Sequence, residues 1–438
     1  MQKLLIKNAL VLDPARGIEA ELDLLAGGGR IISLSRGIRP DPRGAEVYDA
    51  SGLWLMPGIV DMHVHAREPG MERAEDLSTA AAAAAAGGVT SILAMPNTDP
   101  PADDPALIRR LRAKAAGLPV NVFFSAAVTA GRAGRRLAKL GALKKAGAVA
   151  FTDDGASVPG PEPLGRALRL ARDLGVPLLQ HSESFRLTGD GVMHECARAA
   201  RLGLPGIPRE AEVFAVLEDL LAAAAADAPI HLQHLSCRES VELVAAAKKA
   251  GIKATAETCP HYFTLTCSDV KDAAFKMKPP LRERADREAI IRGLADGTID
   301  AIASDHAPHT REEKAKGMLK APFGATGLET MLGLSLTALT LPGRLSRLRL
   351  AELMSANPAR ILGLGRKGAL APGMDADLTL IDPLVSYRVG PDFVSRSSNS
   401  PFIGRRLRGR AEAVVVGGRL VPAQRGAAGA GGSRRFCC

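Results

Sequence analysis

The stretch that decides the fold runs from Ile59 to Met95 and reads IVDMHVHAREPGMERAEDLSTAAAAAAAGGVTSILAM. It holds two short apolar runs, Ile59–His63 and Val89–Met95, on either side of an alanine-rich segment that ends in two glycines. Short, almost wholly apolar runs are typical of parallel strands buried on both faces, and the alanines favour a helix that the glycines end. The stretch therefore predicts a strand–helix–strand unit.

The same alternation continues along the chain, with segments rich in Ala, Leu and charged residues between the apolar runs. The eight expected strands are Ile59–His63, Val89–Met95, Val120–Ala126, Ala148–Thr152, Val176–Gln180, Ile230–His234, Ile252–Glu257 and Ile299–Ser304. Eight strand–helix units predict a closed (β/α)8 barrel, or TIM barrel, over residues 57–365.

The two flanks of this region have a different pattern. Residues 1–56 and 366–422 carry short strand-like pieces separated by Gly and Pro, and neither flank is long enough to build a good core alone. We expect the two flanks to form one small β-sandwich domain beside the barrel. Residues 423–438, rich in Gly, Ala and Ser, are expected to form a disordered tail.

Composition excludes several classes of protein. The 438 residues are 46% hydrophobic and 24% charged, as expected of a soluble globular protein with an ample core. No apolar run approaches the roughly 18–20 residues of a membrane span, and the N-terminal apolar stretch is too short for a secretory signal. The six cysteines form no Cys-x-x-Cys pair, which favours a reduced, cytoplasmic setting and no membrane partner.

The net charge of +10 raises the question of nucleic acid, but aromatic residues make up only 3% of the chain. Little material is therefore available for stacking on bases. A basic surface that attracts small anionic substrates fits the charge better, and we expect no nucleic-acid partner.

Histidines cluster where the expected strands end, which is where barrel enzymes carry their chemistry. His63 and His65 share one face of the first strand because they are two residues apart. The fifth strand ends at His181. The sixth contains His231 and His234, and we prefer His234 as a ligand because it is nearer the mouth.

Two carboxylates are expected at the same mouth. The fourth strand runs into Asp153-Asp154 and the eighth into Asp305. Imidazoles and carboxylates that converge on one point suit zinc or a similar divalent ion, which polarises a carbonyl and lowers the pKa of a bound water toward about 7. Asp305 can take a proton from that water and pass it to a leaving nitrogen. These parts predict a metal-dependent amide hydrolase.

At this point the motifs resemble those of bacterial class I dihydroorotases, members of the amidohydrolase superfamily. The resemblance covers nearly the whole chain except about the last dozen residues. The segments that carry it are Asp61–Gly70 (DMHVHAREPG), Met95–Thr98 (MPNT), Asp153–Gly155 (DDG), Glu257–His261 (ETCPH), Ser304–His309 (SDHAPH), Ala321–Gly324 (APFG) and Gly368–Asp377 (GALAPGMDAD).

The resemblance implies roles for individual residues. Asp154 would bridge two metals, and Asp305 would be both a ligand and the general acid or base. The implied ligands of one or two Zn2+ ions are His63, His65, Asp154, His181, His234 and Asp305. The implied substrate-binding residues are His65, Arg67, Asn97, Lys278, His309, Phe323 and Gly324. Lys278 stands where the family often has Asn, so we expect altered affinity but not lost function.

The implied reaction is the reversible cyclisation of N-carbamoyl-L-aspartate to L-dihydroorotate in pyrimidine (UMP) biosynthesis, by a homodimer that can also bind aspartate transcarbamoylase. One alternative is another cyclic amidase, similar to hydantoinases, dihydropyrimidinases or allantoinases. Those families typically have a carboxylated Lys on strand four, where residues 151–155 offer none, and usually lack an Arg at the position of Arg67. Arg67 suits a substrate carboxylate. The other alternative is a catalytically silent subunit that scaffolds aspartate transcarbamoylase.

Four further features have no assigned role in the chemistry. His194 is expected to be structural. His261 and His306 lie near the mouth, where either can support the metal ligands by hydrogen bonds. The charged segment Thr310–Lys320 is expected to be a solvated surface or a lid.

Overall fold

A computed structural model describes residues 3–39, 44–423 and 426. The disordered tail expected at 423–438 lies outside these residues, apart from 423 and 426. Within the described ranges, no helix is both long and apolar enough to cross a membrane.

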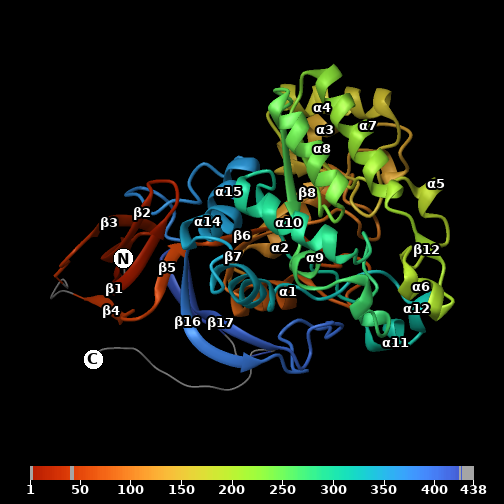
Figure 1. The fold of residues 1–438 in the computed structure, drawn as a ribbon. Helices are drawn as coiled ribbons and strands as arrows, with labels where there is room; N and C mark the ends of the chain where they lie inside the picture. Colours follow the sequence, from red (N-terminus) through yellow and green to blue (C-terminus); the bar gives the residue numbers. More distant parts are fainter. Residues whose placement is uncertain (1–2, 40–43, 424–425, 427–438) are drawn as a thin grey trace.

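Eight parallel strands make up the inner part of the barrel region. They lie in two four-stranded arcs, which are β6 (Ile59–Val64), β7 (Val89–Ala94), β8 (Asn121–Ala126) and β9 (Ala150–Phe151), then β10 (Leu179–Gln180), β13 (Ile230–Leu232), β14 (Ala254–Thr258) and β15 (Ala301–Ile302). Strands β6, β7 and β8 are labelled among the helices in Figure 1. Parallel bridges between Phe151 and Leu178 and between Val64 and His306 join the arcs at both seams. The strands therefore close into the predicted barrel.

Helices surround this ring. The crossover helices are α1 (Leu77–Ala86), α2 (Pro105–Ala115), α3 (Leu140–Ala146), α4 (Pro161–Leu174), α7 (Glu210–Ala226), α8 (Arg238–Lys249) and α10 (Arg284–Asp296). The last part of the barrel is helical over α13 (Met331–Ser335), a π turn (Leu336–Thr340), α14 (Arg347–Ala351), a second π turn (Glu352–Ala356) and α15 (Asn357–Ile361).

Small residues let helix α1 lie close to its neighbours. Five of its seven alanines are buried in the main apolar core, and they are Ala80, Ala81, Ala83, Ala84 and Ala85. At Gly87, where the helix ends, a Cβ atom would lie 2.1 Å from the carbonyl oxygen of Leu328, so the position requires glycine.

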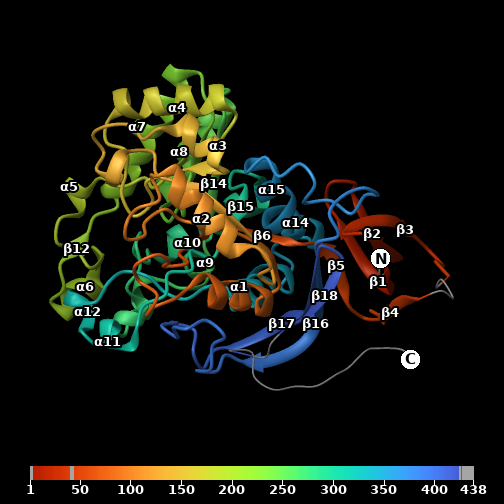
Figure 2. The same ribbon diagram turned by 180° about the vertical axis from the view of Figure 1, so that it is seen from behind.

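The connections at the carboxyl ends of the strands are long and carry short elements. These are a 3-10 turn (Ala130–Arg132), α5 (Phe185–Thr188), β11 (Met193–His194), α6 (Ala197–Leu202), β12 (Gly206–Ile207), α9 (Pro260–Thr264), two 3-10 turns (Cys267–Asp269 and Ala273–Phe275), α11 (Arg311–Lys314) and α12 (Gly317–Lys320). Helices α5, α6, α11 and α12 gather on one side of the molecule, away from the N-terminal strands (Figures 1 and 2).

Both flanks of the barrel build one β-rich unit, as predicted. Its strands are β1 (Lys3–Asp13), β2 (Ile18–Gly27), β3 (Arg30–Ser35), β4 (Ala45–Asp49), β5 (Trp54–Pro57), β16 (Leu378–Arg388), β17 (Arg406–Val416) and β18 (Arg419–Pro422). They form a continuous sheet in the order β18-β17-β16-β5-β1-β2-β3, with β4 on β1, so antiparallel pairing of β5 with β16 joins the two ends of the chain.

The alternation of side chains along β5 connects this sheet to the barrel. Leu55 packs in the sheet's own apolar core, whereas Trp54 and Met56 pack in the barrel core. Neighbouring residues of a strand face opposite sides, so β5 contributes side chains to both apolar cores. The exact domain boundaries stay predictions.

Candidate metal centre and substrate cavity

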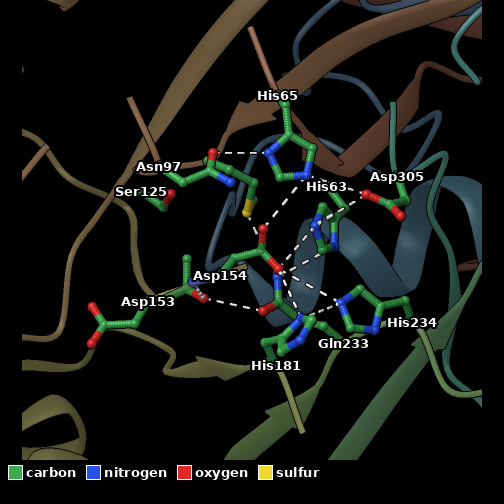
Figure 3. Close-up of polar contacts among 12 residues, drawn as sticks. His63, His65, Asn97, Ser125, Asp153, Asp154, His181, Gln233, His234 and Asp305 are labelled. Atoms are coloured by element: carbon green, nitrogen blue, oxygen red, sulfur yellow. Dashed lines mark hydrogen bonds and ion pairs between the residues drawn. The ribbon is translucent and has the colours of Figure 1, made fainter. Parts of the chain in front are cut away.

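The six residues predicted as metal ligands converge at the mouth of the barrel (Figure 3). His63 lies in β6, and the other five follow the ends of their strands. All six are buried, and they are His63, His65, Asp154, His181, His234 and Asp305.

Four of these residues surround one position. His63 Nε2 lies 3.3 Å from Asp154 Oδ1 and 3.6 Å from Asp305 Oδ1. His65 Nε2 lies 3.2 Å from Asp305 Oδ1 and 3.5 Å from Asp154 Oδ2. Two atoms each bonded to zinc at tetrahedral angles are about 3.4 Å apart. The spacing is therefore that of ligands around one cation.

The remaining two histidines approach Asp154 Oδ1, the oxygen that also faces His63. His181 Nδ1 and His234 Nε2 lie 3.5 Å and 3.6 Å from Asp154 Oδ1, and 2.9 Å from each other. The Asp154 carboxylate thus contacts all four imidazoles, and a shared carboxylate can serve two cations.

The donor atoms themselves fit a cation. Among the described residues, the buried His63 Nε2 has no hydrogen-bond partner, although two carboxylates face it. Burial alone would raise the pKa of Asp154, but the charge of His63 and hydrogen bonds from His181 and His234 hold it well below its ordinary value. The Asp305 pKa is likewise lowered, by the hydrogen bond from His65 and the charge of His63. Both carboxylates are therefore anionic.

Each of three histidines is oriented by a hydrogen bond to its other ring nitrogen. Glu257 Oε1 lies 2.7 Å from His63 Nδ1, and Asn97 Oδ1 lies 2.9 Å from His65 Nδ1. Glu183 Oε2 lies 2.8 Å from His181 Nε2. In a neutral ring such a partner sets the tautomer, so a metal that displaced the second proton of a charged ring would meet an unprotonated nitrogen at the centre.

Sequence reasoning did not single out Glu257 or Glu183. Glu257 is the first residue of the ETCPH segment, one of the motifs that carry the resemblance. The motif therefore pointed to this residue, but nothing in the sequence indicated that it contacts His63. Glu183 follows His181 by two residues in a loop, and no pattern in the sequence indicates its contact.

The alternation of side chains along a strand does not explain why His234 faces the metal cluster. Strand β13 ends at Leu232, and His234 has a φ of 37°, in the left-handed region. His231, inside the strand, contacts Thr255 Oγ1 at 2.9 Å and Glu257 Oε2 at 3.3 Å. Asp305 and Arg67 also have positive φ, of 45° and 59°. Non-glycine residues held this way cost about 1–3 kcal/mol each and are typical of functional sites.

A cavity of about 260 Å³ opens beside these residues. All the residues predicted to bind substrate line it, and they are His65, Arg67, Asn97, Lys278, His309, Phe323 and Gly324. The cavity also contains Asp154, His181, His234 and Asp305, so the predicted metal and substrate groups share one space.

Arg67 is held with part of its guanidinium free. Its Nε donates to the carbonyl oxygen of Pro308 at 3.1 Å, and its Nη2 lies 3.1 Å from His309 Nε2. His309 Nε2 is 2.8 Å from the carbonyl oxygen of Phe323. Burial and Arg67 lower the pKa of His309 to about 2, so the ring is neutral. One neutral nitrogen cannot both donate and accept, and the shorter contact assigns the proton to the bond with Phe323. The remaining Arg67 N–H groups are available to a ligand.

Lys278 brings a second positive charge to the cavity. Its Nζ lies 3.1 Å from Glu183 Oε1 and sits 4.8 Å and 5.1 Å from the ring centres of Phe185 and Phe323. Burial opposes ionisation of Glu183, but His181 and Lys278 lower its pKa to about 2. Lys278 is thereby linked through Glu183 to a predicted metal ligand.

Asp153 and His306, the sequence neighbours of Asp154 and Asp305, do not point into the metal cluster. Asp153 points away from the centre and accepts from the backbone N–H groups of Val128 and Thr129 at 2.9 Å and 3.1 Å. His306 Nε2 contacts Glu75 Oε2 at 3.2 Å, and its Nδ1 accepts from the Gly327 N–H at 3.2 Å.

His194 accepts from Arg282 at 3.1 Å, remote from the cavity. His261 is buried, and within the described chain its Nε2 has no partner. Most of the segment 310–320 is exposed, but Lys314 Nζ donates to the Pro322 carbonyl at 2.9 Å, next to Phe323.

Together the closed barrel and its cluster of imidazoles and carboxylates define a metal-dependent hydrolase of the barrel type. The model of the amidohydrolase family matches residues 54–421. Among solved structures, an L-hydantoinase (dihydropyrimidinase) from Arthrobacter aurescens is similar with a TM-score of 0.86 and 27% identity, over 96% of each chain. A dihydropyrimidinase from Brevibacillus agri gives 0.84 and 25%, over 97% of each chain.

Sequence relatives narrow the family further. A dihydroorotase from Pelobacter propionicus is 48% identical over 95% of this chain and 99% of its own. A dihydroorotase from Pelotomaculum thermopropionicum is 47% identical, over 96% and 98%. The chain therefore belongs to the amidohydrolase family and, within it, to the dihydroorotases.

Proposed function

We propose that this chain catalyses the reversible, zinc-dependent cyclisation of N-carbamoyl-L-aspartate to L-dihydroorotate. The observation that carries the proposal is a buried arginine, Arg67, in the same cavity as Asp154 and Asp305. Burial lowers the pKa of Arg67 to about 10, which leaves the guanidinium cationic at neutral pH. A buried cation beside a metal centre suits an amide substrate that carries a carboxylate.

The proposed metal site has two halves that share Asp154. His63, His65, Asp154 and Asp305 would hold one ion, and His181, His234 and Asp154 a second. The choice of zinc rests on the mixture of imidazole and carboxylate donors. A bound divalent ion would polarise the carbonyl under attack, and it would also lower the pKa of a bound water enough for that water to act as the nucleophile at neutral pH.

The protein's own groups would bind and orient the substrate. The free N–H groups of Arg67 would take the carboxylate, with Asn97 and His309 beside it. Backbone groups of Phe323 and Gly324 would meet the ring. Lys278, which also lines the cavity, would meet a carboxylate or carbonyl oxygen.

Asp305 would move the proton. In hydrolysis it takes a proton from the attacking water and delivers it to the ring nitrogen as the amide C–N bond breaks. In the synthetic direction the same carboxylate removes a proton from the ureido nitrogen as that nitrogen attacks the side-chain carboxyl carbon. The departing oxygen takes that proton from Asp305 and a second proton from solvent, and leaves as water.

A hydantoinase-like amidase is the second candidate, because solved hydantoinases share the fold over nearly the whole chain. Arg67 argues against it, and so does the carboxylate of Asp154 at the shared position. A silent scaffolding subunit is a weaker alternative, since the chain brings all six predicted ligands together.

The test is metal analysis of the purified protein with turnover assays on dihydroorotate, dihydrouracil, hydantoin and allantoin, each with and without a chelator. We expect one or two zinc ions per chain and turnover of dihydroorotate alone, lost on chelation and restored by zinc. No dihydroorotate turnover by the zinc-loaded chain would refute the proposal.

We also propose that the chain forms a homodimer through α4 and α7. Phe214, Leu217 and Leu221 are exposed at helical spacing on α7, and α4 carries the exposed Leu170. Exposed arginines on α4 complement the exposed Glu218 on α7, as an interface between two identical faces requires. Leu217→Glu should give monomers in analytical ultracentrifugation, whereas an unchanged mass would exclude this face. Association with aspartate transcarbamoylase and a cytoplasmic location stay predictions.

A further inference from the structure

A loop from the C-terminal sheet reaches the barrel mouth. Residues 389–405 connect β16 to β17, and the loop extends from the ends of these strands toward α11 (Figure 2). Ser397 Oγ donates to the carbonyl oxygen of Ala74 at 2.6 Å, and the Val394 N–H donates to Glu329 Oε1 at 2.9 Å. These bonds anchor the loop on the barrel side.

Asn399, in this loop, has its whole amide engaged. Its Oδ1 accepts from the His309 N–H at 3.0 Å, and its Nδ2 donates to the carbonyl oxygens of Ala307 and Gly324 at 3.2 Å and 3.1 Å. The residue is 9% exposed. The Oδ1 atom accepts from the one N–H group, and the two N–H groups on Nδ2 donate to the two carbonyl oxygens. These partners therefore fix which way the side-chain amide of Asn399 is turned.

The backbone that Asn399 holds is the backbone that places the substrate groups. Residues 307–309 enclose Pro308, whose carbonyl oxygen accepts from Arg67 Nε at 3.1 Å. The two bonded segments are already at their closest approach, because a Cβ on Gly324 would lie 2.6 Å from the Ala307 Cβ. A shift of either segment therefore moves Arg67, His309 or Gly324 in the cavity.

We propose that Asn399 is a positioning residue for recognition of the substrate carboxylate, acting through the Pro308 carbonyl on Arg67 and through the His309 backbone. Asparagine is specifically suited, because aspartate would place a carboxylate against two carbonyl oxygens. An apolar side chain would leave three polar groups without their bonds. The inference rests on the proposed dihydroorotase function.

The test compares Asn399→Ala with Ser397→Ala in the zinc-loaded full chain. Ser397 is a matched control, since it bonds the same loop to the barrel but contacts none of the cavity residues that Asn399 holds. For Asn399→Ala we expect the KM for dihydroorotate to rise by about tenfold, with kcat within about twofold and zinc content unchanged. Ser397→Ala should leave KM within about twofold. Asn399→Ser, a milder change, should give an intermediate KM if the alanine variant does not fold.

The outcomes separate this inference from the function on which it rests. An inactive wild-type chain overturns the proposed function, and this inference with it. An active wild type with an unchanged KM in the Asn399 variants overturns the inference alone. So does a result in which Asn399→Ala and Ser397→Ala change KM and kcat alike, because that pattern belongs to a purely structural contact.

Discussion

Replacing Arg67 by Met tests the proposed substrate most directly. Methionine keeps an unbranched stem of similar length but removes the guanidinium. Of the five N–H groups of Arg67, the one on Nε is bound to Pro308. The others lie on the two terminal nitrogens, so two charge-assisted hydrogen bonds to a substrate carboxylate are available.

The magnitude follows from those two bonds. At the lower value of about 1.5 kcal/mol each, their loss costs about 3 kcal/mol, or about 150-fold in kcat/KM. The lost bond to the Pro308 carbonyl lowers the stability of the fold by about 1 kcal/mol. Arg67→Lys keeps the charge without the planar fork and should lose less.

Steady-state kinetics with dihydroorotate, together with zinc analysis of each variant, measure the effect. We expect the wild-type zinc content in both variants, because Arg67 is not placed among the metal ligands. A kcat/KM for Arg67→Met within about fivefold of wild type would refute the reasoning. A loss of activity that follows a loss of zinc would assign Arg67 to the metal site instead.

Two further predictions concern other buried groups. Glu257→Gln keeps a hydrogen-bond partner for His63 Nδ1 but removes the negative charge. We expect it to weaken zinc binding by about 10–100-fold, as measured in a competition titration. The control is Thr255→Val, which removes the hydrogen bond to His231 and leaves Glu257 in place. For His194, burial and Arg282 lower the pKa from 6.5 to about 4, so the unfolded chain binds more protons in that window and stability should fall by about 3 kcal/mol as the pH drops through it. His194→Gln, followed by denaturant unfolding at several pH values, should remove that part of the fall, and an unchanged pH profile would contradict the assignment.

The barrel was predictable because its signals are local. Each strand is a short apolar run, each helix has its own composition, and their alternation appears in any window of about forty residues. The His63-Val64-His65 spacing is local in the same sense, since two residues apart on a strand means one shared face. The pairing of β5 with β16 was harder to predict from the sequence, because the two strands are more than 300 residues apart in the chain.

Within the candidate site, residue types at strand ends were visible from the chain alone, but their surroundings were not. Asp153 and Asp154 are adjacent and chemically equal. Only the turn after β9 sends Asp153 toward the backbone of Val128 and Asp154 toward the histidines.

The amino-acid sequence by itself determined the barrel, the strand-rich character of both flanks and the residue types that end the strands, because periodicity and composition act over neighbouring residues. Tertiary structure decided which side chains meet. Glu257 against His63, Glu183 against His181 and Asn399 against His309 join segments with no common pattern. Such contacts depend on where the closed ring and its loops place each backbone in space, and no spacing along the chain encodes that distance.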